Sequence, residues 1–212
     1  MTSTVLTFDA STHTYRLNGS VIPNVTLITG SLASYAGVPA AVLEKARQRG
    51  EAVHYATELY DLGDLDMSSV PESVLGYLLA WQKFRDDTGF VPFDDGIEAR
   101  VHSETYRYAG TIDRAGTFER MAYCKPTVPV LLDLKATYTL LAAVEPQTAG
   151  YMAAWNETRT PKLKRRFAVH LKKDGTYHLH ECREPSDLSV FLAALTCHNW
   201  KARNVERGAT AV

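Results

Sequence analysis

The sequence contains little cysteine, no excess of charge of either sign and no long hydrophobic run. Its three cysteines (Cys124, Cys182 and Cys197) are odd in number and far apart, which argues against a disulfide framework and against a cysteine-rich zinc or iron–sulfur site. The net charge of -1 gives no overall attraction to nucleic acid, so any such surface would be local. The sequence has neither a run of about 18 apolar residues nor the basic and apolar regions of a signal peptide. We therefore expect a cytoplasmic protein without a membrane span.

The length and the order of elements predict one domain over residues 1–212. A chain of 212 residues can bury one full hydrophobic core, and 45% hydrophobic with 22% charged residues is typical of a globular domain. An N-terminal hairpin and loop (1–38) precede a helical region (39–90). A sheet with one helix (96–181) and a C-terminal helix (184–204) follow. This order predicts an α/β fold with a central mixed sheet flanked by helices.

Local signals define several elements within these regions. Asn18-Gly19 between short β-prone runs predicts a hairpin turn, and Pro39 and Pro71 stand where two helices are expected to begin. The acidic residues between these two helices are expected in a solvated linker: Asp61, Asp64 and Asp66. The final helix is expected to turn five apolar side chains inward: Leu188, Phe191, Leu192, Leu195 and Trp200.

The stretch from residue 108 to residue 135 carries the most informative pattern, two apolar strands that each reach an acidic residue. Asp133 and Lys135 are two positions apart, so they point to one face of a strand while Leu134 points into the core. Asp113 ends the other apolar run, and Gly110 before it leaves room for close approach by another segment. Two such carboxylates can hold Mg²⁺ or Mn²⁺, and the lysine can act on a bound water or a scissile phosphate. The alternative is a structural ion pair between Asp133 and Lys135.

Five short motifs follow one another along the chain. They are Gly50-x-x-x-His54 on a helix, Glu98 on a strand, Gly110-x-x-Asp113, Asp133-x-Lys135, and Gln147-x-x-x-Tyr151 on a later helix. In this order, from about residue 39 to residue 151, the sequence resembles the PD-(D/E)XK nuclease superfamily, specifically the RecB-type nuclease domain and its phage exonuclease relatives. The chain departs from relatives that read Asp-x-Lys-Thr, because Ala136 stands before Thr137.

The resemblance implies a restriction-endonuclease-like core and a role for each motif residue. Metal ligands would be His54, Asp113, Asp133 and the backbone carbonyl of Leu134, and they would bind one or two Mg²⁺ or Mn²⁺ ions. Lys135 would be the catalytic lysine, and Glu98 the acidic residue before the Gly-x-x-Asp motif. The remaining pair, Gln147 and Tyr151, would support the site or contact DNA. The cysteine cluster of the iron–sulfur branch is absent, so no such cofactor is expected.

The function implied is a divalent-metal-dependent deoxyribonuclease. It would be an exonuclease acting on DNA ends in phage or bacterial recombination, repair or processing, with DNA and possible recombination or single-strand-binding proteins as partners. A non-catalytic nucleic-acid-binding or protein-interaction module with a nuclease fold is the alternative, and a metal-dependent hydrolase of another phosphoester is a third. The sequence does not indicate an oligomeric state.

Two further groups of residues can contact nucleic acid. A basic cluster can bind phosphate or form a solvated loop: Lys162, Lys164, Arg165 and Arg166. Four aromatic residues can stack on bases, although core packing is the stronger expectation for most of them: Trp81, Tyr106, Tyr108 and Trp155.

Overall fold

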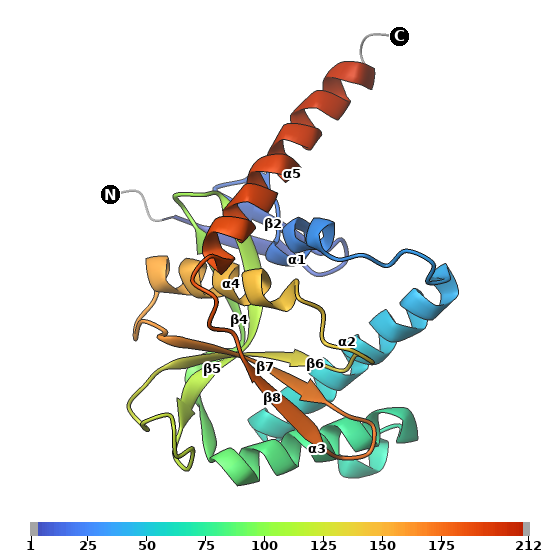
Figure 1. Cartoon of the computed structure of the whole chain (residues 1–212), viewed down its shortest axis with the longest axis vertical. Helices are drawn as coiled ribbons and strands as arrows, with labels where there is room; N and C mark the ends of the chain where they lie inside the picture. Colours follow the sequence, from blue (N-terminus) through green and yellow to red (C-terminus); the bar gives the residue numbers. More distant parts are fainter. Residues whose placement is uncertain (1–3, 210–212) are drawn as a thin grey trace.

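The computed structural model describes residues 4–209, with side chains described to residue 204, so the outermost residues of the predicted domain lie outside it. Three antiparallel strands form a small N-terminal sheet (Figure 1): β1 (Leu6–Asp9), β2 (Thr14–Leu17) and β3 (Ser20–Ile22). Asn18 and Gly19 turn β2 into β3 with positive φ angles of 51° and 80°. These are angles of a two-residue hairpin turn, which confirms the prediction.

Part of the predicted N-terminal loop is helical. The short helix α1 (Val25–Thr29) is followed by the 3₁₀ turn η1 (Gly30–Leu32). The Asn24 side chain caps α1 by accepting a hydrogen bond of 2.7 Å from the backbone N–H of Leu27. The prediction of a loop here was wrong because one and a half helical turns are too short to show a helical period, and the cap is the signal that remains.

A five-stranded mixed sheet forms the centre of the fold. Its strands stand in the order β4 (Phe90–Ser103), β5 (Tyr108–Phe118), β6 (Val130–Lys135), β7 (Arg165–Leu171) and β8 (Tyr177–Glu181). Neighbours are antiparallel except β6 and β7, which run parallel. The connection between these parallel strands contains helix α4 (Val144–Thr158), as a crossover requires.

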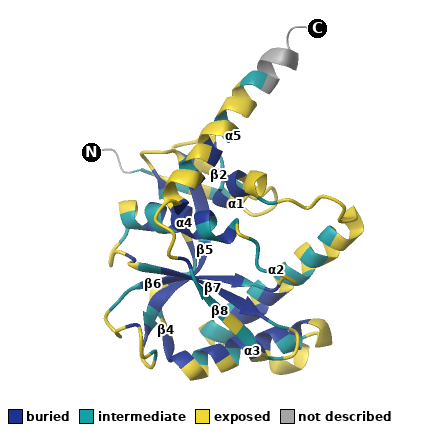
Figure 2. Ribbon diagram, in the orientation of Figure 1, coloured by how far each residue is buried: buried dark blue, intermediate teal, exposed yellow. Residues whose placement is uncertain are grey.

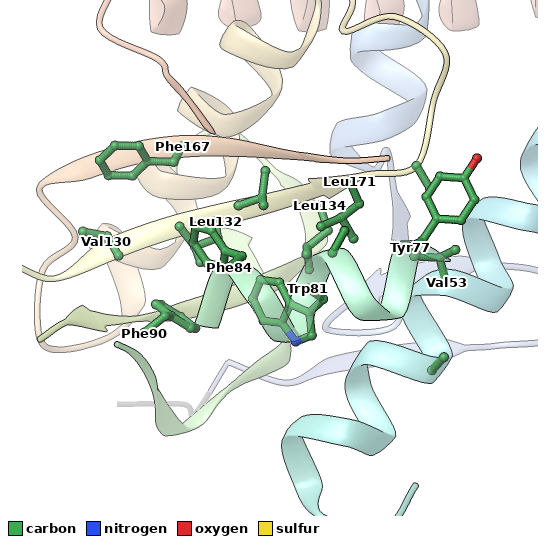
Figure 3. Packing of buried hydrophobic residues seen from close by; sticks show 14 of the residues in the cluster. Val53, Tyr77, Trp81, Phe84, Phe90, Val130, Leu132, Leu134, Phe167 and Leu171 are labelled. Carbon is green, nitrogen blue, oxygen red and sulfur yellow. The ribbon is translucent and has the colours of Figure 1, made fainter. Parts of the chain in front are cut away.

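Helices cover both faces of this sheet. On one face lie α2 (Ala40–Leu62) and α3 (Glu72–Thr88), which follow Pro39 and Pro71 as predicted, with the turn η2 (Met67–Ser69) between them. Figure 3 shows Trp81 and Phe84 of α3 packed toward Leu132 in this layer. On the other face, α4, α1 and the start of α5 (Asp187–Ala209) enclose a second core around Tyr108, Trp155 and Phe191. The architecture is a mixed α/β fold consistent with a restriction-endonuclease-like core.

Helix α5 is buried only over its first part. Phe191 and Leu195 are buried as predicted, whereas the prediction was wrong for Leu188 and Trp200, which are 37% and 60% exposed. The helix extends past the body of the protein (Figures 1 and 2), and residues 196–204 are exposed or only partly buried. No helix among residues 4–209 is long and apolar enough to cross a membrane.

The turn between β4 and β5 is held by one carboxylate of α4. Glu157 accepts hydrogen bonds from Ser103 Oγ at 2.6 Å and from the backbone N–H of Thr105 at 2.8 Å. Partial burial opposes the negative charge of Glu157, but these hydrogen bonds outweigh burial and lower its pKa.

Candidate metal and catalytic site

The site lies where the two central strands separate. β5 and β6 pair only as far as Arg114 and Leu132, so no backbone carbonyl of β5 is paired with the backbone N–H of Leu134. The Asp113 side chain takes that place, because its Oδ2 accepts a hydrogen bond of 2.6 Å from the Leu134 N–H. The separated strand ends leave room for Asp113 and Asp133 on adjacent strands.

Helix α2 brings His54 to this opening. Nδ1 of His54 lies 3.3 Å from Asp113 Oδ1, and Nε2 forms a hydrogen bond of 3.1 Å with the Leu134 carbonyl oxygen. The neighbouring helical residues Val53 and Ala56 are buried in the core below the sheet, which fixes the direction of the His54 ring. Three of the predicted ligands are therefore in direct contact.

Glu98 reaches the same place from β4. Its Oε1 lies 3.9 Å from His54 Nδ1, and the ligand atoms of His54, Glu98 and Asp113 all lie within 4.8 Å of one another. The φ angle of Glu98 is 45°, a region that non-glycine residues rarely adopt, and it directly follows a shift in register between Pro92 and Ile97. Glu98 is thus geometrically able to be a metal ligand, a role that the sequence analysis did not give it.

Asp133 and Lys135 form a second group on β6. The Lys135 ammonium lies 2.8 Å from Asp133 Oδ2. Apart from this ion pair, Asp133 Oδ2 has no hydrogen-bond partner in the described part of the chain. Asp133 is 2% exposed and does not belong to the group formed by His54, Glu98 and Asp113.

These donors fit a divalent cation. Carboxylate and carbonyl oxygens suit Mg²⁺ and Mn²⁺, and the His54 imidazole adds one nitrogen of the kind that transition-metal ions accept. Asp133 adds a buried carboxylate beside the group, and each of its oxygens has two lone pairs, so it can accept a cation as well as the Lys135 ammonium.

Charge in the site is balanced by His54 and Lys135. Burial disfavours the charged form of His54, but Asp113 and Glu98 outweigh it and raise the pKa of His54 to about 10. Burial likewise disfavours the charged form of Asp113, but His54 and Lys135 outweigh it and lower the pKa of Asp113. Without a bound cation, His54 is therefore protonated and supplies positive charge among these oxygen atoms. To ligate a cation it would have to release this proton, because only the neutral imidazole has a free lone pair.

A buried network behind Glu98 was missed by the sequence analysis. Arg114 is fully buried, and it donates to Glu98 Oε1 at 3.0 Å and to Asp61 Oδ2 at 2.6 Å. Asp61 also accepts from Trp81 Nε1 at 3.0 Å and pairs with Arg85. The prediction that Asp61 is solvated was wrong, since its side chain is fully buried. The available signal was Arg114 itself, because a charge inside an apolar strand requires a partner.

Helix α4 supplies the last two predicted residues. Gln147 Nε2 lies 3.5 Å from the Tyr151 hydroxyl, and that hydroxyl lies 3.3 Å from Thr26 Oγ1 of α1. The Tyr151 ring rests against Gly110, where a Cβ atom would lie only 2.5 Å from Tyr151 Cε1. Gly110 thus permits a close approach between β5 and α4, as the sequence analysis expected.

An open cleft of about 870 Å³ brings the predicted side chains together. All seven predicted residues that would act through their side chains line it: His54, Glu98, Asp113, Asp133, Lys135, Gln147 and Tyr151. Leu134 contributes only backbone atoms beside the cleft, because its side chain is buried in the core below the sheet.

The predicted basic cluster lies toward the other end of the sheet. Arg165 and Arg166 stand opposite the start of β6, two or more residues before Asp133. Arg165 donates to Glu181 at 2.6 Å, and the buried Arg166 pairs with Asp187 at 2.8 Å. Both arginines therefore bind carboxylates of this chain.

The other members of the cluster, Lys162 and Lys164, are exposed. Of the four aromatic residues considered for stacking, Trp81, Tyr108 and Trp155 are fully buried in the core and cannot meet a base, while Tyr106 is 45% exposed.

Comparison with known proteins gives no family assignment. No protein-family model matches the sequence, and no curated protein matches it. Solved structures that align with it include the crystal structure of a "putative exonuclease" from Eubacterium rectale, with 13% identity over 76% of this chain and 68% of that chain and a TM-score of 0.49. Another is the crystal structure of SSO0001, with 16% identity over 68% of this chain and 66% of that chain and a TM-score of 0.36.

Proposed function

We propose that this chain is a divalent-metal-dependent nuclease that hydrolyses phosphodiester bonds at DNA ends. One observation carries the proposal: His54, Glu98 and Asp113, from three separate elements, meet beside an Asp133–Lys135 pair in one open cleft. A structural ion pair alone explains neither the convergence of three further titratable groups nor their access to solvent.

The metal would be held by His54, Glu98 and Asp113, with Asp133 and the Leu134 carbonyl next to them. When bound, such an ion offsets the charge of a phosphodiester and lowers the pKa of a water molecule. The chain's own contribution is a set of fixed donors, because Asp113 is tied to the backbone of β6 and Glu98 is tied to Arg114.

Lys135 would act on the reacting groups. Its ammonium carries three donors, and the ion pair with Asp133 holds it at the wall of the cleft with 23% of the side chain exposed. From there it can position a water or offset charge that develops on the scissile phosphate. The choice of DNA ends as substrate rests on the order of the motifs in the sequence.

The proposal is tested with end-labelled linear DNA and closed circular DNA in Mg²⁺, Mn²⁺ or EDTA. Linear DNA should be degraded with either metal, circles should be degraded far more slowly, and EDTA should stop both reactions. Asp113→Asn should be inactive, and Asp64→Asn, which changes an exposed acid outside the cleft, should match the wild type. Full activity in EDTA would refute the metal mechanism, and equal rates on circles would indicate an endonuclease. Binding without cleavage would favour the non-catalytic module.

Metal binding can be measured without turnover. A ligand that binds only the folded state raises the melting temperature. Mn²⁺ should therefore raise the melting temperature of the wild type and of Asp64→Asn, and it should have a much smaller effect on His54→Ala. An equal rise in all three proteins would place the metal elsewhere.

A further inference from the structure

A second, smaller pocket opens beside the cleft. Its volume is about 210 Å³, and Thr26, Lys135 and Gln147 line both this pocket and the cleft. A group bound at Lys135 can therefore extend into it without leaving the protein surface. Ligand sites for drug-sized molecules occupy roughly 300–1,000 Å³, so this pocket suits a smaller group.

The lining of the pocket is mostly apolar. Leu140, Leu141 and Val144 line it from the connection between β6 and α4 and the first residue of α4. The segment after α1 also contributes, with Ala33 and Tyr35 among its lining residues. Three threonine hydroxyls and the Gln147 amide add hydrogen-bonding groups: Thr26, Thr29 and Thr137.

We propose that this pocket receives the base of the nucleotide next to the scissile phosphate, an inference that rests on the proposed nuclease function. A nucleobase has flat faces that favour apolar and aromatic contacts, and its edges carry hydrogen-bond donors and acceptors. The pocket offers the leucine side chains and the Tyr35 ring to the faces. The Gln147 carboxamide, which both donates and accepts, is available to the edge.

Connectivity supports this occupant over an unrelated small molecule. The base and the phosphate of one nucleotide are joined through a sugar, so a base subsite must adjoin the phosphate site, and Lys135 stands in the wall shared by both cavities. A base within a duplex is paired and stacked and must leave the stack to enter a pocket. The substrate end is therefore single-stranded or opened at its last base pair.

A filled pocket provides the test. Ala33 lines the pocket and has an extended backbone, with a φ of -94° and a ψ of 139°, so Ala33→Phe should place a ring in it without backbone strain. Ala36→Phe, three residues along the same exposed segment, adds a ring outside the pocket and is the matched control. The substrates are single-stranded oligonucleotides that have either a normal or an abasic terminal nucleotide, with the abasic site placed at each end in turn.

The readout is the ratio of rates on normal and abasic ends within each protein, so a general loss of folded protein does not imitate the effect. Stacking of one base contributes enough for about a tenfold difference. The wild type and Ala36→Phe should prefer the normal end at one terminus by about tenfold, and Ala33→Phe should lose that preference. Binding of the same oligonucleotides in EDTA should show the same pattern without turnover.

The outcomes separate the two proposals. If the wild type cleaves normal and abasic ends equally, or if Ala33→Phe keeps the full preference, the base pocket is refuted while the nuclease stands. If the wild type cleaves no DNA with Mg²⁺ or Mn²⁺, the nuclease proposal is refuted and the base pocket with it.

Discussion

Substitution of Asp61 by leucine should destabilise the fold by about 3 kcal/mol. The side chains of Asp61 and Arg114 are fully buried, with Arg114 Nε 2.6 Å from Asp61 Oδ2. Removing one partner of a buried ion pair leaves an uncompensated charge, at a cost of about 3–5 kcal/mol. Glu98 remains 3.0 Å from Arg114 and compensates in part, so the lower end of this range is expected.

The double variant isolates the ion pair from simple packing. Arg114→Met alone should cost about as much as Asp61→Leu, because it leaves Asp61 with fewer donors. Asp61→Leu/Arg114→Met leaves neither of the two charges in place, and apolar replacement of a buried pair is often neutral or stabilising. Arg85, Trp81 and Glu98 still each lose one contact in the double variant, so some loss of stability remains. The double variant should therefore lose far less than the roughly 6 kcal/mol expected from the sum of the single variants.

Unfolding in urea, followed by two spectroscopic probes, measures these free energies, provided that the slope against denaturant stays constant. Asp64→Leu changes an exposed acid three residues away and should stay within about 0.5 kcal/mol of the wild type. A loss below about 1 kcal/mol for Asp61→Leu, or strict additivity in the double variant, would refute the network as a source of stability.

Three further predictions address the site and its supports. Lys135→Ala should lower kcat by roughly 100-fold with little change in DNA affinity, as measured by single-turnover kinetics and equilibrium binding. If the variant instead folds poorly, and the fraction that does fold keeps the wild-type specific activity, the lysine is purely structural. Gly110→Ala should lower the free energy of unfolding by about 1–3 kcal/mol, because its Cβ would overlap the Tyr151 ring. Gly50→Ala has open space around its Cβ and should instead raise the free energy of unfolding by up to about 1 kcal/mol, as measured by thermal unfolding. The lowered pKa of Glu157 contributes stability above its unfolded value of 4.5. Because solvent screens this exposed carboxylate, Glu157→Gln should cost less than about 1 kcal/mol at pH 7 and still less as the pH falls below 4.5. A cost that stays constant down to pH 3 would contradict this.

Local rules were enough to predict the elements that carry the site. Period-two alternation placed Asp133 and Lys135 on one face of β6, and the side chain of Leu134 between them is buried on the other. The two helix-initiating prolines and the Asn-Gly turn also mark positions that depend on backbone chemistry alone. These features follow from residues close together in the sequence.

The missed features depend on partners far apart in the sequence. Asp61 pairs with Arg114, 53 residues later, and no spacing rule connects the end of a helix to the middle of a strand. Glu98 carries a left-handed backbone beside a register shift, which period-two alternation does not predict. The exposure of Trp200 likewise depends on where the body of the fold ends beneath α5, so its apolar character was misleading.

Asp113 connects the fold to the chemistry of the site. One of its oxygens accepts the Leu134 N–H at 2.6 Å where β5 and β6 no longer pair, and the other faces His54 Nδ1 at 3.3 Å. The strand separation that creates the cleft is thus stabilised by a carboxylate that is itself a candidate ligand. Asp113→Ala would leave a buried N–H without an acceptor, so a loss of activity in that variant would mix stability with function. Asp113→Asn keeps an amide oxygen to accept the Leu134 N–H while it removes the negative charge, and its inactivity therefore reports on the metal site alone.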